Sequence, residues 1–231
     1  MLIAERQQKI LQIIERQGGA TVEELVRMLY ASAPTIRRDL TAMEQNGLIQ
    51  KVYGGAIPLT AANREIPLNI REQSQSSAKD RMAERAASHV RNGMVILMDG
   101  SSSVNRIVKY LDGFKDLIVV TSGAKTAVDL AERNITTLCT GGQLLNHSLS
   151  YVGHKAEEFV RGINADLLFF SCHGINEEGL LTDLAMEEVH LRQLMLKQAK
   201  KSVLLCDRSK YDKTYFYTLC HKDDIDIIIT E

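Results

Sequence analysis

The sequence predicts a two-domain protein of the α/β class: an N-terminal winged helix-turn-helix, then a larger C-terminal α/β domain with a mostly parallel sheet. Amphipathic segments joined by a very short connection, with a Gly-Gly hairpin after them, predict the first domain. Six strand-like runs that alternate with helical periodicity predict the second. We expect the two domains at residues 1–57 and 77–231, with a linker over 58–76 that has two prolines and weak periodicity.

Composition and charge set broad limits on the chain. Its 231 residues are 45% hydrophobic and 25% charged, which is ordinary for a globular protein and allows one small and one medium domain. The net charge of -1 argues against a polybasic membrane-binding protein, and no apolar run approaches the length of a spanning helix or a secretory signal. We therefore expect a cytoplasmic protein with no membrane partner.

The first domain opens with two helices whose apolar residues share one face. These residues are Ile10, Ile13 and Ile14 in the first helix, and Val22, Leu25, Val26 and Leu29 in the second. Thr21 and Glu24 form a capping box that sets the start of the second helix. Only Tyr30 and Ala31 separate this helix from the next cap, which is the spacing of a helix-turn-helix.

The third helix has the pattern of a DNA recognition helix. Ser32 suits the N-cap and Pro34 suits the first turn. One apolar stripe, at i, i+4 and i+7, must face the core: Ile36, Leu40 and Met43. Arg38 then projects to the opposite side with Thr41, where a base edge could meet it. Asn46-Gly47 ends the helix, because glycine accepts the left-handed conformation.

A hairpin completes the winged form of the motif. Residues 48–53 and 56–57 supply its strands, and Gly54-Gly55 accept the positive φ angles of a tight turn. Residues 1–57 carry seven Lys/Arg against six Asp/Glu, so affinity for DNA has to come from a few placed cations and from dimerisation. The plain alternative is a small helical domain with a solvated arginine pair. The side chains that we expect to contact double-stranded operator DNA are Ser32, Pro34, Thr35, Arg37, Arg38, Thr41, Lys51 and Tyr53.

The cysteines and histidines indicate no metal site and no cofactor. The four cysteines are far apart in the sequence and two lie in apolar, strand-like runs, so we expect reduced core residues: Cys139, Cys172, Cys206 and Cys220. Cys172 and His173 are adjacent, but neighbours on a strand point to opposite faces, so we expect no shared metal ion.

The second domain opens with a helix from Ser77 to Val90. Helical periodicity fills most gaps between the strand-like runs, which cover residues 94–98, 117–120, 135–139, 166–170, 202–206 and 226–230. Strands that alternate with helices favour a parallel sheet that is covered on both faces.

Polar clusters follow five of these strands. Ligands bind beyond the carboxyl ends of parallel strands, and we expect a small phosphorylated molecule there. Residues 101–103 would hold its phosphate, Asp99 and Asp183 its sugar hydroxyls, and Arg192 or Lys210 would neutralise the phosphate charge. The expected ligand contacts are Asp99, Gly100, Ser101, Ser102, Ser103, Thr121, Ser122, Gly141, Gly142, Gly174, Asp183, Glu188, Arg192 and Lys210.

These motifs resemble the DeoR/GlpR family of bacterial sugar-catabolism repressors. Thr35-Ile36-Arg37-Arg38-Asp39-Leu40 and the later Gly54-Gly55-Ala56 carry the N-terminal resemblance, and the strand-end clusters extend it over essentially the remaining chain. The resemblance implies a winged helix-turn-helix joined to a sensor domain of the ribose-5-phosphate isomerase and CoA-transferase fold. It also implies a homo-oligomeric repressor, a dimer or tetramer, that a phosphorylated sugar or similar metabolite releases from its operator.

Some positions depart from the pattern of that family. Asp99-Gly100-Ser101-Ser102-Ser103 replaces the usual aspartate-any-glycine-threonine-threonine, and Thr121-Ser122 replaces threonine-asparagine. Leu184-Ala185 replaces proline and asparagine, and in the wing Lys51 and Tyr53 replace arginine and histidine.

An enzyme is the second class of function, because related folds isomerise or deaminate sugar phosphates. Asp183, Glu187 or Glu188 could supply a general base. However, Glu188 and Arg192 at i and i+4 are almost equally consistent with an ordinary surface ion pair on a helix. The sequence has no other obvious acid-base pair at fixed spacing, and an enzyme has no need of the N-terminal domain. We therefore expect a regulator with no catalytic residues.

Overall fold

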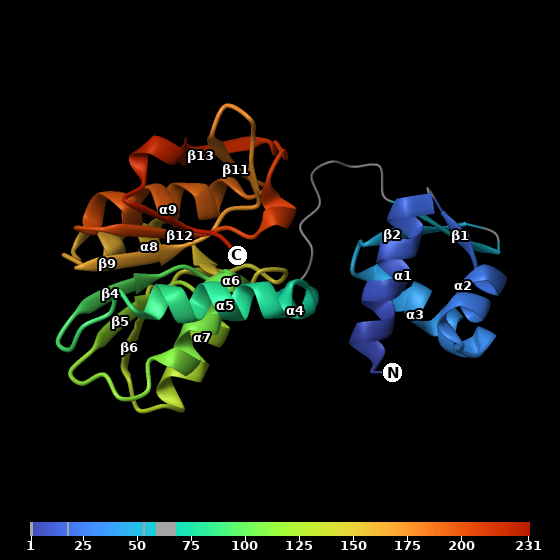
Figure 1. Ribbon diagram of the computed structural model, residues 1–231, viewed down its shortest axis with the longest axis horizontal. Coiled ribbons are helices and arrows are strands. Elements are labelled where there is room, and N and C mark those ends of the chain that lie inside the picture. Colours follow the sequence, from blue (N-terminus) through green and yellow to red (C-terminus); the bar gives the residue numbers. More distant parts are fainter. Residues whose placement is uncertain (1, 18, 53, 59–67) are drawn as a thin grey trace. The chain divides into compact units, whose positions relative to one another are not determined.

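The chain folds into two units, Met1–Ser74 and Gln75–Glu231, in a computed structural model (Figure 1). The structure describes residues 2–17, 19–52, 54–58 and 68–231. Within these ranges, no helix has both the length and the apolar character needed to cross a membrane.

The first unit is a winged helix-turn-helix, as the sequence predicts. Its elements are α1 (Ile3–Gln17), β1 (Ala20–Thr21), α2 (Val22–Leu29), α3 (Ala33–Gln45), β2 (Ile49–Val52), β3 (Gly55–Pro58) and α4 (Leu68–Gln73). The three strands pair antiparallel in the order β1-β3-β2. Because α4 falls within residues 58–76, part of the expected linker is helical.

Capping sets the starts of α2 and α3 where the sequence indicates. The Thr21 hydroxyl accepts from the Glu24 amide at 3.2 Å, and the Glu24 carboxylate accepts from the Thr21 amide at 2.8 Å. Ser32 Oγ accepts from the Thr35 amide at 3.4 Å. Gly47 follows α3 with a φ of 67°. These contacts satisfy backbone groups that a helix end leaves without an intrahelical partner.

The predicted apolar stripe of α3 packs into the core of this unit. Ile36, Leu40 and Met43 are at most 1% exposed and belong to one cluster with Ile10 and Ile14 of α1. Full burial of one such side chain contributes about 1.5–3 kcal/mol. The packing of this stripe therefore fixes which face of α3 meets solvent.

The wing differs from the prediction in one detail. Gly54 has a φ of 81° and lies in the turn, but Gly55 lies in β3 and pairs with Val52. A Cβ atom on Gly55 would stand 2.3 Å from the Ala20 carbonyl oxygen, so a glycine is required where β1 approaches β3. Tyr53, one of the expected DNA contacts, lies outside the described residues.

The second unit is built on a six-stranded parallel sheet, as predicted. The strand order is β14-β12-β9-β4-β5-β6, and every pairing is parallel. Each strand overlaps one predicted run: β4 (Val95–Met98), β5 (Ile118–Thr121), β6 (Thr136–Cys139), β9 (Leu167–Phe170), β12 (Ser202–Leu205) and β14 (Ile227–Ile229). Since β9 and β4 are the central strands, the loops after them lie in the middle of the carboxyl edge.

Helices cover both faces of this sheet (Figure 1). They are α5 (Ser76–Ala87), α6 (Ser102–Asn105), α7 (Ala124–Ala131), α8 (His154–Arg161), α9 (Met186–Gln198) and the 3-10 helices η1 (Arg106–Tyr110), η2 (Arg208–Lys210) and η3 (Lys222–Asp224). The face with Ile96 and Phe169 packs against α5 and α7, and the face with Leu97 and Phe170 packs against α8 and α9. Burial on both faces explains why the central strands are apolar throughout.

Two small antiparallel sheets are absent from the sequence-based prediction. One contains β10 (Gly174–Ile175), β11 (Leu180–Asp183) and β13 (Tyr217–His221), and the other contains β7 (Gln143–Leu144) and β8 (Tyr151–Val152). Most of these strands are too short to show alternation. The expectation that Cys139 is a core residue is wrong, since this cysteine is exposed on β6, an edge strand of the large sheet.

Candidate functional site

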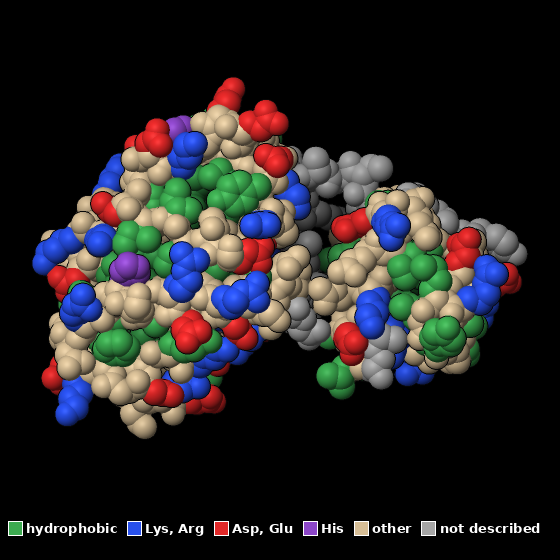
Figure 2. Space-filling view, in the orientation of Figure 1, with side chains coloured by type: hydrophobic (Ala, Val, Ile, Leu, Met, Phe, Trp, Pro, Cys, Tyr) green, Lys and Arg blue, Asp and Glu red, His purple; other side chains and the backbone are tan. Residues whose placement is uncertain are grey.

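The recognition helix α3 presents an exposed row of side chains. Pro34, Arg37 and Arg38 are exposed, Thr35 and Thr41 are half-buried, and the apolar stripe opposite lies in the core. On the face of the molecule in Figure 2, basic and acidic side chains are interspersed, in line with the balanced charge of the sequence. Arg38 thus points away from the core, on the side of α3 where the sequence predicts DNA contacts.

A groove of about 1170 Å³ lies between α2, α3 and the wing. One cationic side chain from each of these elements lines it: Arg27, Arg37 and Lys51. The start of α2 also borders the groove, with Thr21, Val22 and the acidic Glu23, but the Val22 amide already donates to the Gly54 carbonyl and the Glu24 amide to Thr21 Oγ1. The three cations against one acid still give the groove a positive charge, which suits the phosphates of a nucleic-acid backbone.

Lys51 of the wing is tied to α3. Its Nζ lies 3.0 Å from Thr41 Oγ1 and 3.8 Å from Glu44 Oε2, and its backbone amide donates to Glu44 Oε1 at 3.0 Å. Thr41 Oγ1 also donates to the Arg37 carbonyl at 2.9 Å. These contacts hold the wing cation beside α3.

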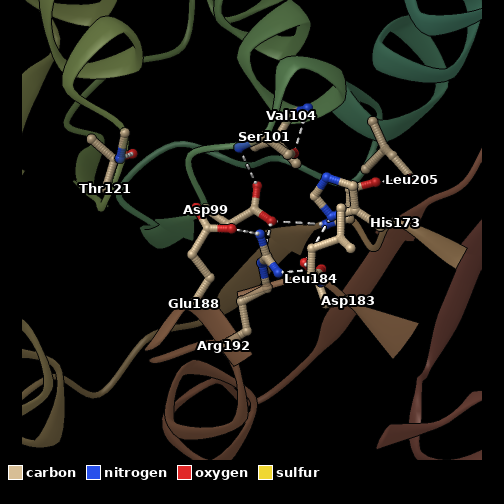
Figure 3. Close-up of polar contacts among 12 residues, drawn as sticks. Asp99, Ser101, Val104, Thr121, His173, Asp183, Leu184, Glu188, Arg192 and Leu205 are labelled. Carbon is tan, nitrogen blue, oxygen red and sulfur yellow. Dashed lines mark hydrogen bonds and ion pairs between the residues drawn. The ribbon is translucent and has the colours of Figure 1, made fainter. Parts of the chain in front are cut away.

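In the second unit, Arg192 joins three carboxylates at the carboxyl edge of the sheet (Figure 3). Its Nε lies 3.0 Å from Asp99 Oδ2, its Nη1 2.6 Å from Asp183 Oδ2 and its Nη2 3.2 Å from Glu188 Oε2. All four side chains are at most 6% exposed. The alternative of a surface pair between Glu188 and Arg192 is therefore wrong, and the arginine is surrounded by the protein's own anions.

Asp99 fixes the loops that follow β4 and β9. Its carboxylate accepts hydrogen bonds from the amides of Ser101 at 2.9 Å and Ser171 at 3.0 Å. Ser171 Oγ in turn accepts from Nζ of Lys210, a half-buried side chain in η2, at 2.6 Å. The loops after three neighbouring strands, β4, β9 and β12, are thus linked around one carboxylate.

Asp183 ends β11 and faces His173. Its Oδ1 lies 2.7 Å from His173 Nδ1 and accepts from the Leu184 amide at 2.8 Å. Burial acts to raise the pKa of Asp183, but the Arg192 charge, His173 and the Leu184 amide outweigh burial and hold this pKa well below its usual range. Asp183 therefore stays ionised at neutral pH.

A buried lysine that the sequence analysis missed reaches the same edge. Lys79, in the first turn of α5, is 4% exposed, and its Nζ lies 3.0 Å from Ser102 Oγ. Asp207 is buried nearby, and although burial acts to raise its pKa, the charge of Lys210, hydrogen bonds within its own loop and the charge of Lys79 lower it. The ammonium groups of Lys79 and Lys210 therefore both lower the pKa of one buried carboxylate, that of Asp207, and Lys79 also contacts the serine-rich loop of residues 101–103.

Three further predicted ligand residues lie next to Asp99. Thr121 pairs with Met98, and the Ser122 amide donates to the Met98 carbonyl at 3.3 Å. A Cβ atom on Gly100 would stand 3.3 Å from Gly123 Cα, so the loops after β4 and β5 approach closely. The structure brings these residues to the same sheet edge as the serine-rich loop.

Gly141, Gly142 and Gly174 have local backbone roles. Gly141 and Gly142 have φ angles of 68° and 101°, which L side chains rarely adopt. A Cβ atom would stand 2.5 Å from the Val152 carbonyl oxygen at Gly142, and 2.5 Å from the Lys213 carbonyl oxygen at Gly174. Close packing thus accounts for the last two glycines without a ligand.

The sequence analysis found the strand-end loops but not all of their members. Its list of expected ligand contacts omits Lys79, Ser171 and His173. Lys79 gave a signal, because a lysine stands beside Ala78, Met82 and the other apolar residues of a buried helix face. The other two gave none, since a single serine and a single histidine after a strand have no distinctive pattern.

Both units match models of one family. Residues 6–61 match the DeoR-like helix-turn-helix domain, and residues 74–231 match the DeoR C terminal sensor domain. The chain belongs to the DeoR family of transcriptional regulators. This finding confirms the resemblance drawn from the sequence, and with it the class of a DNA-binding regulator.

Relatives in the DeoR family match over almost the whole chain. HTH-type transcriptional regulator GolR of Listeria innocua is 36% identical over 228 residues, with 98% of this chain and 90% of that one covered. HTH-type transcriptional regulator GlpR of Haloferax volcanii is 32% identical over 231 residues, with 100% and 91% covered. Both are named as regulators rather than as enzymes.

Solved structures show likeness of fold alone. The eIF2B delta structure from Chaetomium thermophilum has a TM-score of 0.52 and 16% identity, and it covers 68% of this chain and 56% of that one. Ribose 5-phosphate isomerase A from Methanocaldococcus jannaschii has a TM-score of 0.45 and 15% identity, with 60% and 55% covered.

Proposed function

We propose that this DeoR-family regulator is a repressor of a sugar-catabolism operon, which binds operator DNA through α3 and is released by a phosphorylated sugar. The observation that carries the DNA-binding mode is the exposure of Arg38 on the side of α3 opposite the buried stripe. A guanidinium in that position suits the two acceptors of guanine in the major groove.

In this mode the remaining contacts position the protein on the DNA backbone. Arg37 and Lys51 line the groove between α2, α3 and the wing, so they meet phosphates rather than bases. The cap residue Ser32 and the α3 residues Pro34, Thr35 and Thr41 are further proposed contacts, and Tyr53 stays a proposed contact.

A gel-shift titration with the DNA upstream of the protein's own gene tests this proposal. We expect specific binding that weakens as salt rises, and release by one member of a panel of phosphorylated sugars. Binding of random DNA with equal affinity would contradict the regulator mode. Tighter binding in the presence of a sugar phosphate would contradict repression and indicate an activator.

We infer that the effector phosphate lies against residues 101–103, between Lys79 and Lys210. Two observations support this position. Lys79 contacts the Ser102 hydroxyl and Lys210 contacts the Ser171 hydroxyl, both at the carboxyl edge of the sheet. In addition, Ser103 Oγ is buried with no hydrogen-bond partner among the described residues. Of the two cations expected to neutralise the phosphate, Lys210 is favoured over Arg192, because Arg192 already faces three carboxylates.

The sugar hydroxyls then meet Asp99 and Asp183. A carboxylate has about four acceptor positions, and each of these two uses three in contacts with Arg192 and neighbouring amides or His173. Acceptor capacity is therefore left on each, but both carboxylates are buried, so a ligand hydroxyl meets them only when the loops at this edge open.

The same contacts argue against Asp183 as the general base of an isomerase or deaminase. A general base needs a pKa near the working pH, whereas the pKa of Asp183 lies well below its usual range. Incubation of the protein with ribose and glucosamine phosphates tests the choice. Thermal stabilisation without turnover supports a sensor, and steady turnover would support the enzyme.

We further propose that the regulator acts in the cytoplasm as a homodimer or tetramer, since helix-turn-helix proteins commonly read two half-sites with two copies. Light scattering of the free protein and of its complex with DNA measures the number of chains. A monomer that binds one half-site with full affinity would contradict this proposal.

A further inference from the structure

Cys172 and Cys206 stand side by side at the carboxyl edge of the sheet. They follow β9 and β12, which pair in parallel with Phe170 opposite Leu204. Continuing this register by two residues places Cys172 opposite Cys206. Both thiols belong to one buried apolar cluster, so both lie on the same face of the sheet. Their distance in the sequence concealed this pairing.

The spacing of the two strands suits a disulfide. Neighbouring strands lie about 4.8 Å apart, within the range of about 4.4–6.8 Å between the Cα atoms of bridged cysteines. Both cysteines are free thiols in the structure. A bridge requires their Cβ atoms to come within about 4 Å of one another, so the two strand ends have to move together.

The two thiols are chemically unequal. The pKa of Cys206 is lowered, chiefly by its interaction with the Cys172 thiol and also by the Lys210 charge, although burial opposes the shift. The pKa of Cys172 is raised by the same interaction and by burial. The two sulfurs thus interact directly, and the Lys210 charge favours a thiolate on Cys206.

We propose that Cys172 and Cys206 are a redox pair that a small peroxide converts into an intramolecular disulfide, and that this bond weakens effector binding. The Cys206 sulfur attacks one oxygen of hydrogen peroxide, the O–O bond breaks, and the other oxygen leaves as water with the thiol proton. The Cys172 sulfur then attacks the sulfenic sulfur, and the hydroxyl leaves as a second water with the Cys172 proton. Two thiols are oxidised and one peroxide is reduced.

Burial restricts the oxidant to a small molecule. Cys172 is 4% exposed and Cys206 is fully buried, so an oxidant reaches the pair only when the strand ends open locally, which a molecule as small as peroxide can use and a bulky disulfide such as oxidised glutathione cannot. The other two thiols differ from this pair. Cys139 is exposed on an edge strand, and burial raises the pKa of Cys220 to about 12, which suppresses its thiolate.

The effect on the effector site follows from the neighbours of the pair, and this half of the inference rests on the proposed function. Ser171 precedes Cys172 and joins Asp99 to Lys210, while Asp207 follows Cys206. Drawing the two strand ends together shifts these side chains relative to one another. The oxidised protein should then hold a phosphate less well.

The test uses the full chain with Cys139 and Cys220 replaced by serine. Hydrogen peroxide should remove both remaining thiols from a titration under denaturing conditions, lower the intact mass by two hydrogen atoms and leave a peptide pair joined through Cys172 and Cys206. Dithiothreitol on the unfolded protein should restore both thiols. With Cys172→Ser added, the reaction should stop at a sulfenic acid on Cys206 that dimedone traps.

A second measurement needs no variant. Arsenite is a small arsenical that bridges paired thiols, so one molecule should bind the unmodified folded chain in a form that excess monothiol does not remove. Failure of the arsenical to bridge overturns the pairing. Persistence of both thiols, at a peroxide concentration that oxidises the exposed Cys139 of the unmodified chain, overturns the redox chemistry.

The last arm compares reduced and oxidised protein in thermal-shift titrations with inorganic phosphate and ribose 5-phosphate. We expect the dissociation constant to rise about tenfold on oxidation, within the range of ordinary site-to-site coupling. A disulfide that leaves the dissociation constant unchanged overturns the regulatory half. If neither form binds either probe while the disulfide forms, the effector proposal fails and the redox chemistry stands.

Discussion

Arg6 of α1 and Asp39 of α3 form a two-point ion pair inside the first unit. Arg6 Nε lies 2.5 Å from Asp39 Oδ2, and Nη2 lies 3.2 Å from Oδ1. The side chains are 12% and 4% exposed. Asp39 follows Arg38 directly, yet it points inward while Arg38 points to solvent. The pair therefore acts together with the buried stripe of α3 to hold the rotation of this helix about its own axis and, with it, the direction of the recognition face.

Replacement of Asp39 by alanine should destabilise the first unit. Removing one partner of a buried ion pair leaves the other charge uncompensated, which costs about 3–5 kcal/mol, and we expect the lower end because Arg6 is partly exposed. Urea unfolding followed by circular dichroism measures the change.

Glu5→Ala provides the matched control, since it removes an exposed i,i+4 pair with Lys9 on the same helix. Its effect should stay below about 1 kcal/mol. Equal stabilities of the two variants would show that the Arg6–Asp39 pair does not hold α3.

Arg38→Ala should weaken operator binding and reduce discrimination between operator and random DNA. Loss of one placed arginine-base contact costs about 1–3 kcal/mol, or about 5- to 150-fold in the dissociation constant. Arg37→Ala should instead weaken binding of both DNAs by similar factors and lower the salt dependence, because a phosphate contact has no sequence preference.

Gel-shift titrations at two salt concentrations separate these effects, with Arg16→Ala in α1 as an exposed arginine outside the recognition surface. Unchanged discrimination in the Arg38 variant would refute the proposed docking of α3.

Patterns that repeat within a short segment made the fold predictable. The stripe of Ile36, Leu40 and Met43, the capping box at Thr21 and the six apolar runs each depend on neighbours in sequence, and the structure confirms all of them. The wing was less certain, because whether a glycine stands in a turn or in a strand depends on an approaching segment, here Ala20 against Gly55.

The candidate effector site was harder to predict, because distant segments meet there. The loop positions of Asp99 and Asp183 followed from the sheet rule, but their joint contact with Arg192 depends on how α9 packs over the sheet. Lys79 comes from α5, which no rule about strand ends includes. Likewise, the thiol pair depends on the order of strands in space.

The ionised Asp183 makes the second unit sensitive to acid. Its pKa in the folded chain lies below the unfolded value of about 4. The stabilisation is therefore fully present above the unfolded pKa and is lost as pH falls through the folded pKa. Unfolding free energies measured between about pH 6 and pH 3 should fall less steeply for Asp183→Asn than for the unmodified chain.

Glu187→Gln is the control for this pH dependence, because Glu187 is an exposed neighbour on α9. It should keep the steep fall of the unmodified chain. If the Asp183 variant shows the same slope as the unmodified chain, the contact with Arg192 does not hold that carboxylate in its charged form.

Lys79→Met should weaken binding of a phosphorylated effector while leaving DNA affinity unchanged in the effector's absence. The Lys79 ammonium is buried 3.0 Å from Ser102 Oγ, so it needs only a small adjustment to meet a phosphate oxygen there. Loss of one charged hydrogen bond costs about 1.5–3 kcal/mol, or about 10- to 150-fold in the dissociation constant. Thermal-shift titration measures this constant, and gel shift measures the effector concentration that releases DNA.

Lys79→Arg keeps the charge and should retain most binding, while Lys197→Met removes an exposed lysine from α9 and should behave as the unmodified chain. If Lys79→Met binds the effector normally, the phosphate lies elsewhere. If it binds the effector normally yet fails to release DNA, Lys79 instead transmits the signal along α5.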